Sequence, residues 1–165
     1  PIYSVAHRRL GSARVERLRD WCTEVAATAG GFLCGATTSS LVPGDTPGSG
    51  QLLMGEELGR GPAECDLGWL AGEFTEFRLL HFTPPKYQVH AHGCAAAVRG
   101  LLRGYGGSFD RDLVARVAVL RVLTHAHDFA AYVGWIDQLI SYVDLVADLV
   151  AGDLETIVAK EPEYA

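Results

Sequence analysis

The stretch GFLCGATTSSLVPGDTPGSGQLLMGE, residues 31–56, places two short apolar runs on either side of a segment rich in Gly, Pro and Ser. Short apolar runs bounded by turn residues are typical of strands, and a connection of this composition predicts a hairpin. We expect the small and hydroxyl residues that follow the first run to form a loop. The stretch therefore predicts a small β element early in the chain.

On both sides of this element, apolar residues recur at helical spacing. Helices are predicted over residues 11–29, from residue 64 to the prolines at 84 and 85, over residues 88–103, from Ser108 or Asp110 to Gly134, and over residues 136–150. The predicted fold is mainly α: a helical bundle with a small early β-hairpin, forming a single domain over residues 1–165.

The overall charge and the cysteine spacing exclude several classes of protein. A net charge of −6 over 165 residues argues against a nucleic-acid binder or an anionic-membrane binder, since both need a basic face. No apolar run approaches the roughly 20 residues that a membrane span needs. The four cysteines are widely spaced, as expected for buried thiols in the reducing cytoplasm, where we expect this protein to work.

Two stretches resemble the C-terminal lobe of the aminoglycoside-phosphotransferase and choline-kinase family: GRGPAECDLGWLAGEF, residues 59–74, and LLRGYGGSFDRDLVARVAVLRVLTHAHDFAAYVGW, residues 101–135. The resemblance implies a protein-kinase-like C-terminal lobe, with the N-terminal nucleotide lobe absent from this chain. It also implies that Asp66 holds the catalytic loop through hydrogen bonds. The family's His-Gly-Asp position is occupied here by Cys34-Gly35-Ala36.

The catalytic residues of that family are degenerate in this sequence. Ala36 stands at the position of the catalytic Asp and Leu41 at that of the metal-binding Asn, and neither side chain can orient a hydroxyl or bind magnesium. Gly55 matches the second metal-binding Asp, with Glu56 one residue out of register. No cofactor or metal is therefore predicted. ATP and magnesium enter only if an upstream or separate N-terminal lobe completes an active phosphotransferase.

The leading hypothesis is a pseudokinase domain that binds a partner protein, a peptide or a small ligand. The amino-acid composition of the chain resembles that of proteins from high-GC actinobacteria. This resemblance implies a role in bacterial secondary metabolism or modified-peptide biosynthesis. An active phosphotransferase lobe and an unrelated all-α interaction domain, dimerising through its last helix, are the alternatives. The candidate ligand-binding residues are Thr37, Ser39, Glu56, Asp66, His125 and Asp128.

Other polar residues are expected to have structural or surface roles. Glu73 and Glu76 lie three residues apart and predict a solvent-facing polar side of a helix. Asp128 with Arg121 or His125 has the spacing of exposed helical ion pairs. The His pairs of HAHGC, residues 90–94, and THAHD, residues 124–128, lie two residues apart, so on a helix the members of each pair point in different directions and cannot chelate one metal ion.

Overall fold

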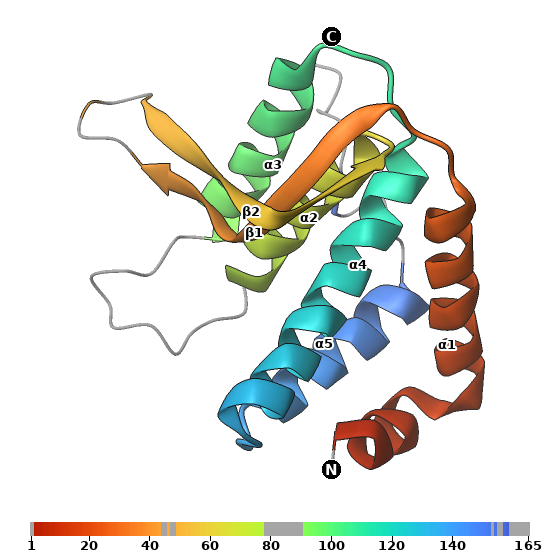
Figure 1. Ribbon diagram of the computed structural model, residues 1–165. Helices are drawn as coiled ribbons and strands as arrows, with labels where there is room; N and C mark the ends of the chain where they lie inside the picture. The colour runs from red at the N-terminus through yellow and green to blue at the C-terminus, as the bar shows by residue number, and fades with distance from the viewer. Residues whose placement is uncertain are drawn as a thin grey trace, which may run out of the picture.

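The computed structural model describes residues 2–43, 46, 49–77, 91–152, 154 and 157–158. The elements in this part are α1 (Ile2–Ala27), β1 (Phe32–Pro43), β2 (Gly50–Gly61), α2 (Glu64–Phe77), α3 (Ala91–Tyr105), α4 (Arg111–Asp128), the π-helical turn η2 (Phe129–Val133) and α5 (Leu139–Ala151). The five helices and the two-stranded antiparallel sheet confirm the predicted mainly helical fold with a small early β element (Figure 1).

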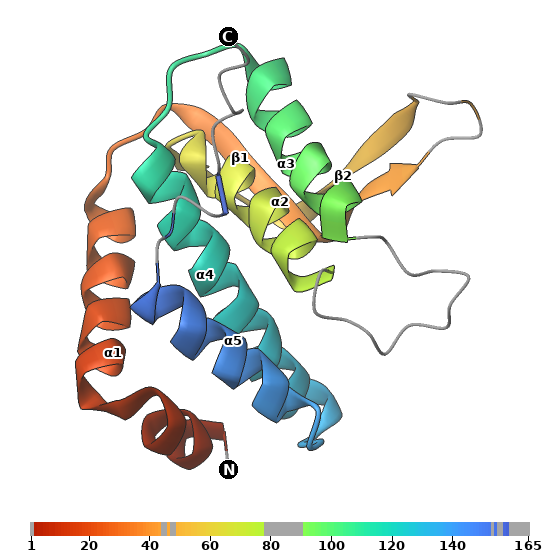
Figure 2. The same cartoon turned by 180° about the vertical axis from the view of Figure 1, so that it is seen from behind.

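The helices are arranged around α4. This helix contacts α2, and it also contacts α1 and α5, which lie side by side. α2 in turn contacts α3 and β1, so the hairpin is separated from α5 by two helical layers (Figures 1 and 2). The core lies where these helices meet, and its fully buried side chains include Val114, Val119, Val122, Val143 and Val146.

α1 is longer than predicted and is kinked. A helix was predicted to begin at residue 11, whereas α1 begins at Ile2 and has non-helical backbone angles at Gly11, with φ of 73° and ψ of 161°. Glycine adopts a positive φ without the steric cost of a Cβ, so it allows the chain to turn sharply here. Leu10 before the kink and Leu18 after it are both buried. The extra helical segment thus folds back onto the same core.

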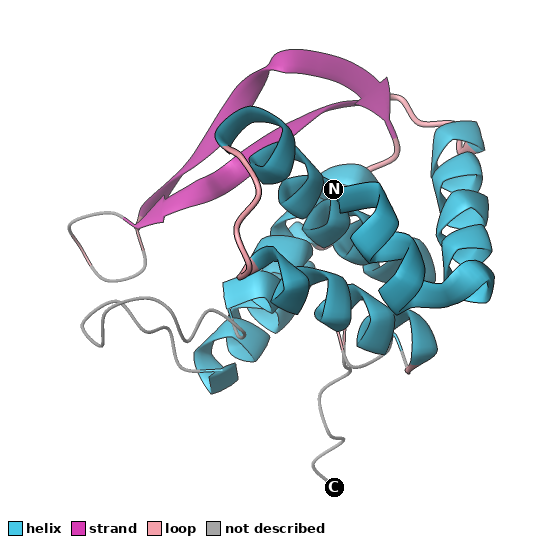
Figure 3. Ribbon diagram, turned by 90° about the horizontal axis from the view of Figure 1, so that it is seen from below, coloured by secondary structure: helices cyan, strands magenta, loops and turns pink. Residues whose placement is uncertain are grey.

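The predicted loop of small and hydroxyl residues is instead part of a strand. β1 continues through residues 36–43, because its backbone groups are paired with those of β2 (Figure 3). The pairing is irregular in the middle of the hairpin. The paired positions on either side of the irregularities are Cys34 with Gly59, Ala36 with Met54, and Leu41 with Leu52.

In this register, the two strands have unequal numbers of residues between consecutive pairs. Between the first two pairs, β1 advances two residues while β2 advances five, and between the last two pairs β1 advances five while β2 advances two. Residues 55–58 of β2 and residues 37–40 of β1 therefore lie in bulged backbone, and bulges commonly re-aim side chains next to functional sites. Thr37, Ser39 and Glu56 lie in these segments, but their side chains are outside the described part of the structure.

α2 and α4 run in the same direction and approach each other closely. At their N-terminal ends, the Asp110 backbone N–H donates to the Glu64 carboxylate over 2.7 Å. Further along, a Cβ added at Gly68 would lie 2.7 Å from the Val114 carbonyl oxygen, and one added at Gly72 would lie 2.6 Å from that of Ala118. Only glycine fits at these two positions, since real Cβ atoms are not found so close to backbone oxygens.

Asp110 is the N-cap of α4. Its carboxylate accepts hydrogen bonds from the backbone N–H groups of Asp112 and Leu113, over 2.9 and 3.1 Å. Of the two predicted N-cap residues, Ser108 and Asp110, it is therefore Asp110 that caps α4. Because the cap also bonds to Glu64, the start of α4 is tied to the start of α2.

The apolar face of the last helix, α5, packs against other helices of the same chain. α5 spans Leu139–Ala151, and its apolar residues Leu139, Val143, Val146 and Val150 are buried in a fold where α5 contacts α1 and α4. The apolar face of this helix is therefore not available for the dimer considered in the sequence analysis. The hairpin also excludes a purely α-helical domain.

The remaining helix boundaries differ only slightly from prediction. α3 is described from Ala91 and ends at Tyr105, and the predicted start at residue 88 lies outside the described residues. Residues 78–90, including Pro84, Pro85 and His90, lie outside the described part of the chain. None of the described helices combines the length and the apolar character needed to cross a membrane.

Candidate functional site

The start of the hairpin is tied to the start of α2. The Gly35 backbone N–H donates a hydrogen bond of 3.0 Å to the Asp66 carboxylate. Next to it, the Cys34 thiol donates to the Pro62 carbonyl oxygen over 3.3 Å. The contact from Asp66 is the one that the kinase resemblance implies. It fixes the position of the tripeptide Cys34-Gly35-Ala36 relative to α2.

A pocket of about 470 Å³ lies beside this tie, between β1, α2 and α3. Its volume falls in the range typical of sites for small molecules. Asp66 provides a carboxylate and Cys34 a thiol, while the rest of the lining is apolar or aromatic. That lining consists of Phe32, Ala63, Leu67, Leu70, Gly100, Leu101, Gly104 and Tyr105.

The two cysteines near this pocket are weak nucleophiles. Burial, together with the neighbouring Cys34 thiol and the Asp66 and Glu64 carboxylates, raises the pKa of the Cys65 thiol to about 11. Burial and the Asp66 carboxylate likewise raise the pKa of Cys34. Both thiols are therefore protonated at neutral pH, whereas nucleophilic attack requires the thiolate.

The residues at the catalytic position do not fit the magnesium that the kinase resemblance would bring. Ala36, Leu41 and Gly55 have no side-chain oxygen, and magnesium binds through oxygen ligands. Within the described part of the chain, no three side chains of His, Cys, Asp and Glu gather closely enough to hold a metal ion. We therefore derive no chemical step through a metal at this position.

A second polar cluster, formed by Glu76, Arg121, His125 and Tyr142, lies at the other end of α2. Arg121 forms an ion pair with one oxygen of Glu76. The other oxygen accepts a hydrogen bond of 3.0 Å from the Tyr142 hydroxyl and lies 2.6 Å from Nδ1 of His125. One carboxylate thus connects α2 with α4 and α5. We call these four residues the Glu76 cluster.

The Glu76 cluster corrects the expectation that its charged residues face solvent. Relative exposure is 3% for Glu73, 2% for Glu76 and 1% for Arg121. Buried charges persist in proteins when they are paired and hydrogen-bonded, and the Glu73 carboxylate also interacts electrostatically with Arg121. Asp128 is exposed and lies 3.0 Å from its neighbour His127, rather than pairing with Arg121.

The protonation of His125 follows from these neighbours. Burial lowers its pKa, the Arg121 guanidinium lowers it further, and Asp128 and Glu73 oppose the shift. Burial also raises the pKa of Tyr142. The edge-to-face contact with the Tyr142 ring, 5.8 Å between centroids, helps to hold the imidazole next to Glu76.

The structure separates the candidate residues into two groups. Asp66 lies in the first turn of α2, and His125 contacts Glu76 near the last turn of the same helix. The ten helical steps from Asp66 to Glu76 correspond to about 15 Å along the axis of α2. His125 and Asp128 therefore do not join Asp66 in one binding site.

Sequence reasoning missed the pairing of Glu76 with Arg121, although a signal was present. Each residue is embedded in a largely apolar run, WLAGEFTEF at 69–77 and VAVLRVLT at 117–124. A charge within such a run predicts a buried residue that needs a partner. The identity of that partner depends on the parallel packing of α2 and α4.

Comparison with known protein families, curated proteins and solved structures finds no match to this chain. Functional inference therefore rests on the geometry of the two sites.

Proposed function

We propose that this protein is a non-catalytic ligand-binding domain built on a phosphotransferase-like C-terminal lobe. The observation that carries the proposal is the hydrogen bond from Gly35 to Asp66 beside the 470 Å³ pocket. It keeps the catalytic-loop position of the resembled family next to a cavity, while Ala36 supplies no base. We infer that this cavity is a place for a guest, beside a tripeptide whose Ala36 cannot act as the base in phosphoryl transfer.

The chemistry of the pocket favours an amine with an apolar body. Asp66 places a carboxylate in the wall, and the lining residues within the described part of the chain include no Lys, Arg or His. Phe32 and Tyr105 offer aromatic faces, which attract cations as well as apolar groups. A small aromatic amine meets all three features. The net charge of −6 also favours cationic over anionic ligands.

Calorimetry with phenethylamine, and with phenylacetate as the anion of similar shape, tests this preference. We expect the amine to bind and the acid to bind at least tenfold more weakly. Asp66→Asn removes the charge but keeps an oxygen that can accept the Gly35 hydrogen bond. It should weaken amine binding without unfolding the hairpin. Equal affinity for the two compounds would refute the assignment of an amine.

A graded pair of substitutions at Gly104 tests the location. Gly104 lines the pocket, and a Cβ added there meets no atom within 4 Å. Gly104→Ala should therefore leave binding nearly intact, and Gly104→Leu should block it. Both variants should fold, because each replaces a helical glycine by a better helix former. Undiminished binding to the leucine variant would place the ligand elsewhere.

The absence of phosphate transfer has its own test. ATP with magnesium should produce no binding heat and no ADP, whether or not the amine is present. Magnesium-dependent nucleotide binding at micromolar concentration would overturn the proposal and favour an active lobe. In that case Glu56→Gln is the variant to compare, because Glu56 lies in the bulged segment opposite Gly35.

A further inference from the structure

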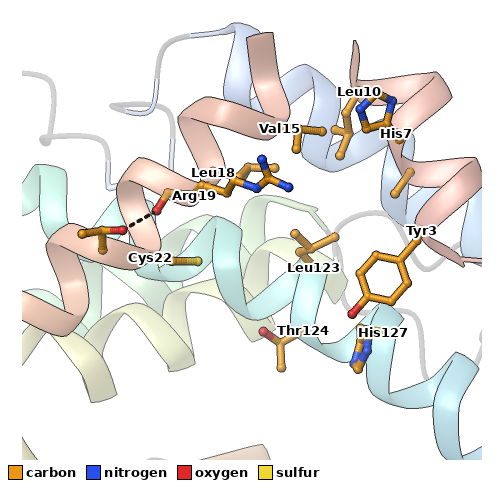
Figure 4. A pocket seen from close by; sticks show the side chains of 12 residues that line it. Tyr3, His7, Leu10, Val15, Leu18, Arg19, Cys22, Leu123, Thr124 and His127 are labelled. Atoms are coloured by element: carbon orange, nitrogen blue, oxygen red, sulfur yellow. Dashed lines mark hydrogen bonds between the residues drawn. The ribbon is translucent and has the colours of Figure 1, made fainter. Parts of the chain in front are cut away.

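A larger pocket lies in the bend of α1, on the opposite side of α4 from α2. Its volume is about 780 Å³, and it is lined by both limbs of α1 and by α4. Figure 4 shows Tyr3 and His7 on the first limb, Leu18, Arg19 and Cys22 on the second, and Leu123, Thr124 and His127 on α4. The pocket shares no lining residue with the one beside Asp66.

The pocket owes its shape to the kink. Because Gly11 turns the chain with φ of 73°, the first limb does not continue along the axis of the second. The apolar side chains of Leu10, Val15, Leu18 and Leu123 all line the space between the limbs and α4. A preformed apolar cavity of this size with a few polar groups is the usual form of a small-molecule site.

Arg19 is the one arginine among the described residues that line this pocket, and it lies in a segment of α1 rich in arginine. Residues 7–19 contain five arginines and His7, against Glu16 as the one acid, in a chain whose net charge is −6. Among the residues that the structure describes, His7, Arg19 and His127 line the pocket and no Asp or Glu does. Such a local excess of positive charge attracts anions.

The Arg19 and His127 side chains at the rim can exchange their present partners for a ligand. Arg19 pairs with Glu16 over 2.8 Å, but the side chains are 70% and 64% exposed, and such surface pairs contribute little to stability. His127 lies 3.0 Å from the exposed Asp128 carboxylate, and its ring contacts that of Tyr3 edge to face. Neither group is locked into a buried network, in contrast to Arg121.

We propose that this pocket binds a free amphipathic monoanion, with an apolar chain or ring against the leucines and an acid group at the Arg19 rim. The apolar lining residues favour the chain or ring of the ligand, and the positive charge of Arg19 favours its acid group. This site is distinct in place and in ligand charge from the proposed amine site. Either proposal can therefore fail without the other.

Decanoate is the probe for the test, with decanol and decyltrimethylammonium as matched neutral and cationic chains. We expect decanoate to bind more tightly than both, and to shift amide resonances of α1 and α4 rather than those of α3. Tighter binding of either control would overturn the assignment of an anion. Vesicles of phosphatidylglycerol form a second arm, and binding to vesicles without binding of decanoate would overturn the free-ligand proposal.

Two arginine variants separate a specific contact from the general charge of α1. Arg19→Gln should weaken decanoate binding about two- to fivefold, as expected for a partly exposed ion pair. Arg8→Gln removes the same charge from an exposed position on α1 that does not line the pocket. It should change the affinity less than Arg19→Gln does. Equal effects of the two variants would refute the role of Arg19.

Two filling variants test the location. Thr124→Phe and Cys22→Phe each place a ring in the pocket from an exposed position, on α4 and on α1 respectively. Circular dichroism shows which of the two variants folds, and binding is measured with a folded variant. We expect a folded filling variant to lose decanoate binding while it keeps phenethylamine binding. Retained decanoate binding would overturn the assignment of this pocket.

Discussion

Replacing Arg121 by Met should destabilise the protein more than any other single charge removal on α4. Met fills much of the volume of the arginine stem, so the loss of packing is small. The substitution leaves the Glu76 carboxylate, which is 2% exposed, without the cation with which it pairs. Breaking a buried pair in this way costs about 3–5 kcal/mol of the free energy of unfolding.

That loss is large for a protein of this size. Domains are stable by about 5–15 kcal/mol. For 165 residues, each kcal/mol corresponds to about 2–4 °C in melting temperature, so Arg121→Met should lower the Tm by roughly 6–20 °C. Urea denaturation followed by circular dichroism measures the free energy, and a thermal melt measures the Tm.

Arg116→Met is the matched control on the same helix. Arg116 forms an ion pair with Glu24, but the two side chains are 24% and 50% exposed. Removing a partly solvated pair of this kind should cost at most about 1 kcal/mol. If the two substitutions cost the same, or if Arg121→Met costs less than about 1 kcal/mol, the Glu76 cluster does not hold the helices together as described.

A second substitution tests the coupling within the cluster. Glu76→Gln keeps the shape of the side chain but removes its charge, and we expect a loss of about 1–3 kcal/mol. The double variant Glu76→Gln/Arg121→Met should lose less than the sum of the single losses, because part of the cost of removing Arg121 is the unpaired charge of Glu76. Strict additivity would contradict the direct pairing of these two residues.

Three further outcomes follow from individual residues. Gly72→Ala should destabilise the protein in urea denaturation by about 1–3 kcal/mol through overpacking against α4, whereas Gly100→Ala, which meets no atom within 4 Å, should stabilise α3 by up to about 1 kcal/mol. Because the pKa of His125 is lowered on folding, the unfolded state binds the proton first. The free energy of unfolding should therefore fall as the pH drops below the unfolded pKa of about 6.5, and His125→Gln should flatten that decrease in denaturation curves measured from pH 7 to 5. Asp66→Ala removes the acceptor for Gly35, so hydrogen exchange at that amide should accelerate markedly, and an unchanged rate would contradict the bond.

Local signals predicted the framework of this protein because they act over a few residues. Helical spacing located the helices, Gly30 and Gly31 marked the end of α1, and Asp110 could be named as one of two possible caps. The kink at Gly11 was not predicted, because a glycine within a periodic segment is compatible with either a straight or a bent helix.

The hairpin shows where local preference was insufficient. Gly, Ser and Thr in residues 35–40 favoured a loop, but the pairs that Ala36 and Leu41 form with β2 keep this segment within the strand as bulged backbone. The bulged register depends on both strands and cannot be read from either alone. The sequence did identify Cys34 and Asp66, which the structure places beside one pocket, but not the aromatic and apolar residues of α3 that complete it.

The sequence by itself determined the mainly helical composition and the early β element, since each depends on residue type and short-range spacing. Only the tertiary structure decided which charges are buried. Glu76 and Arg121 are 45 residues apart and meet because Gly68 and Gly72 let α2 and α4 approach closely. That same packing separates Asp66 from His125. A contact between distant residues depends on the whole arrangement of helices, which no local pattern contains.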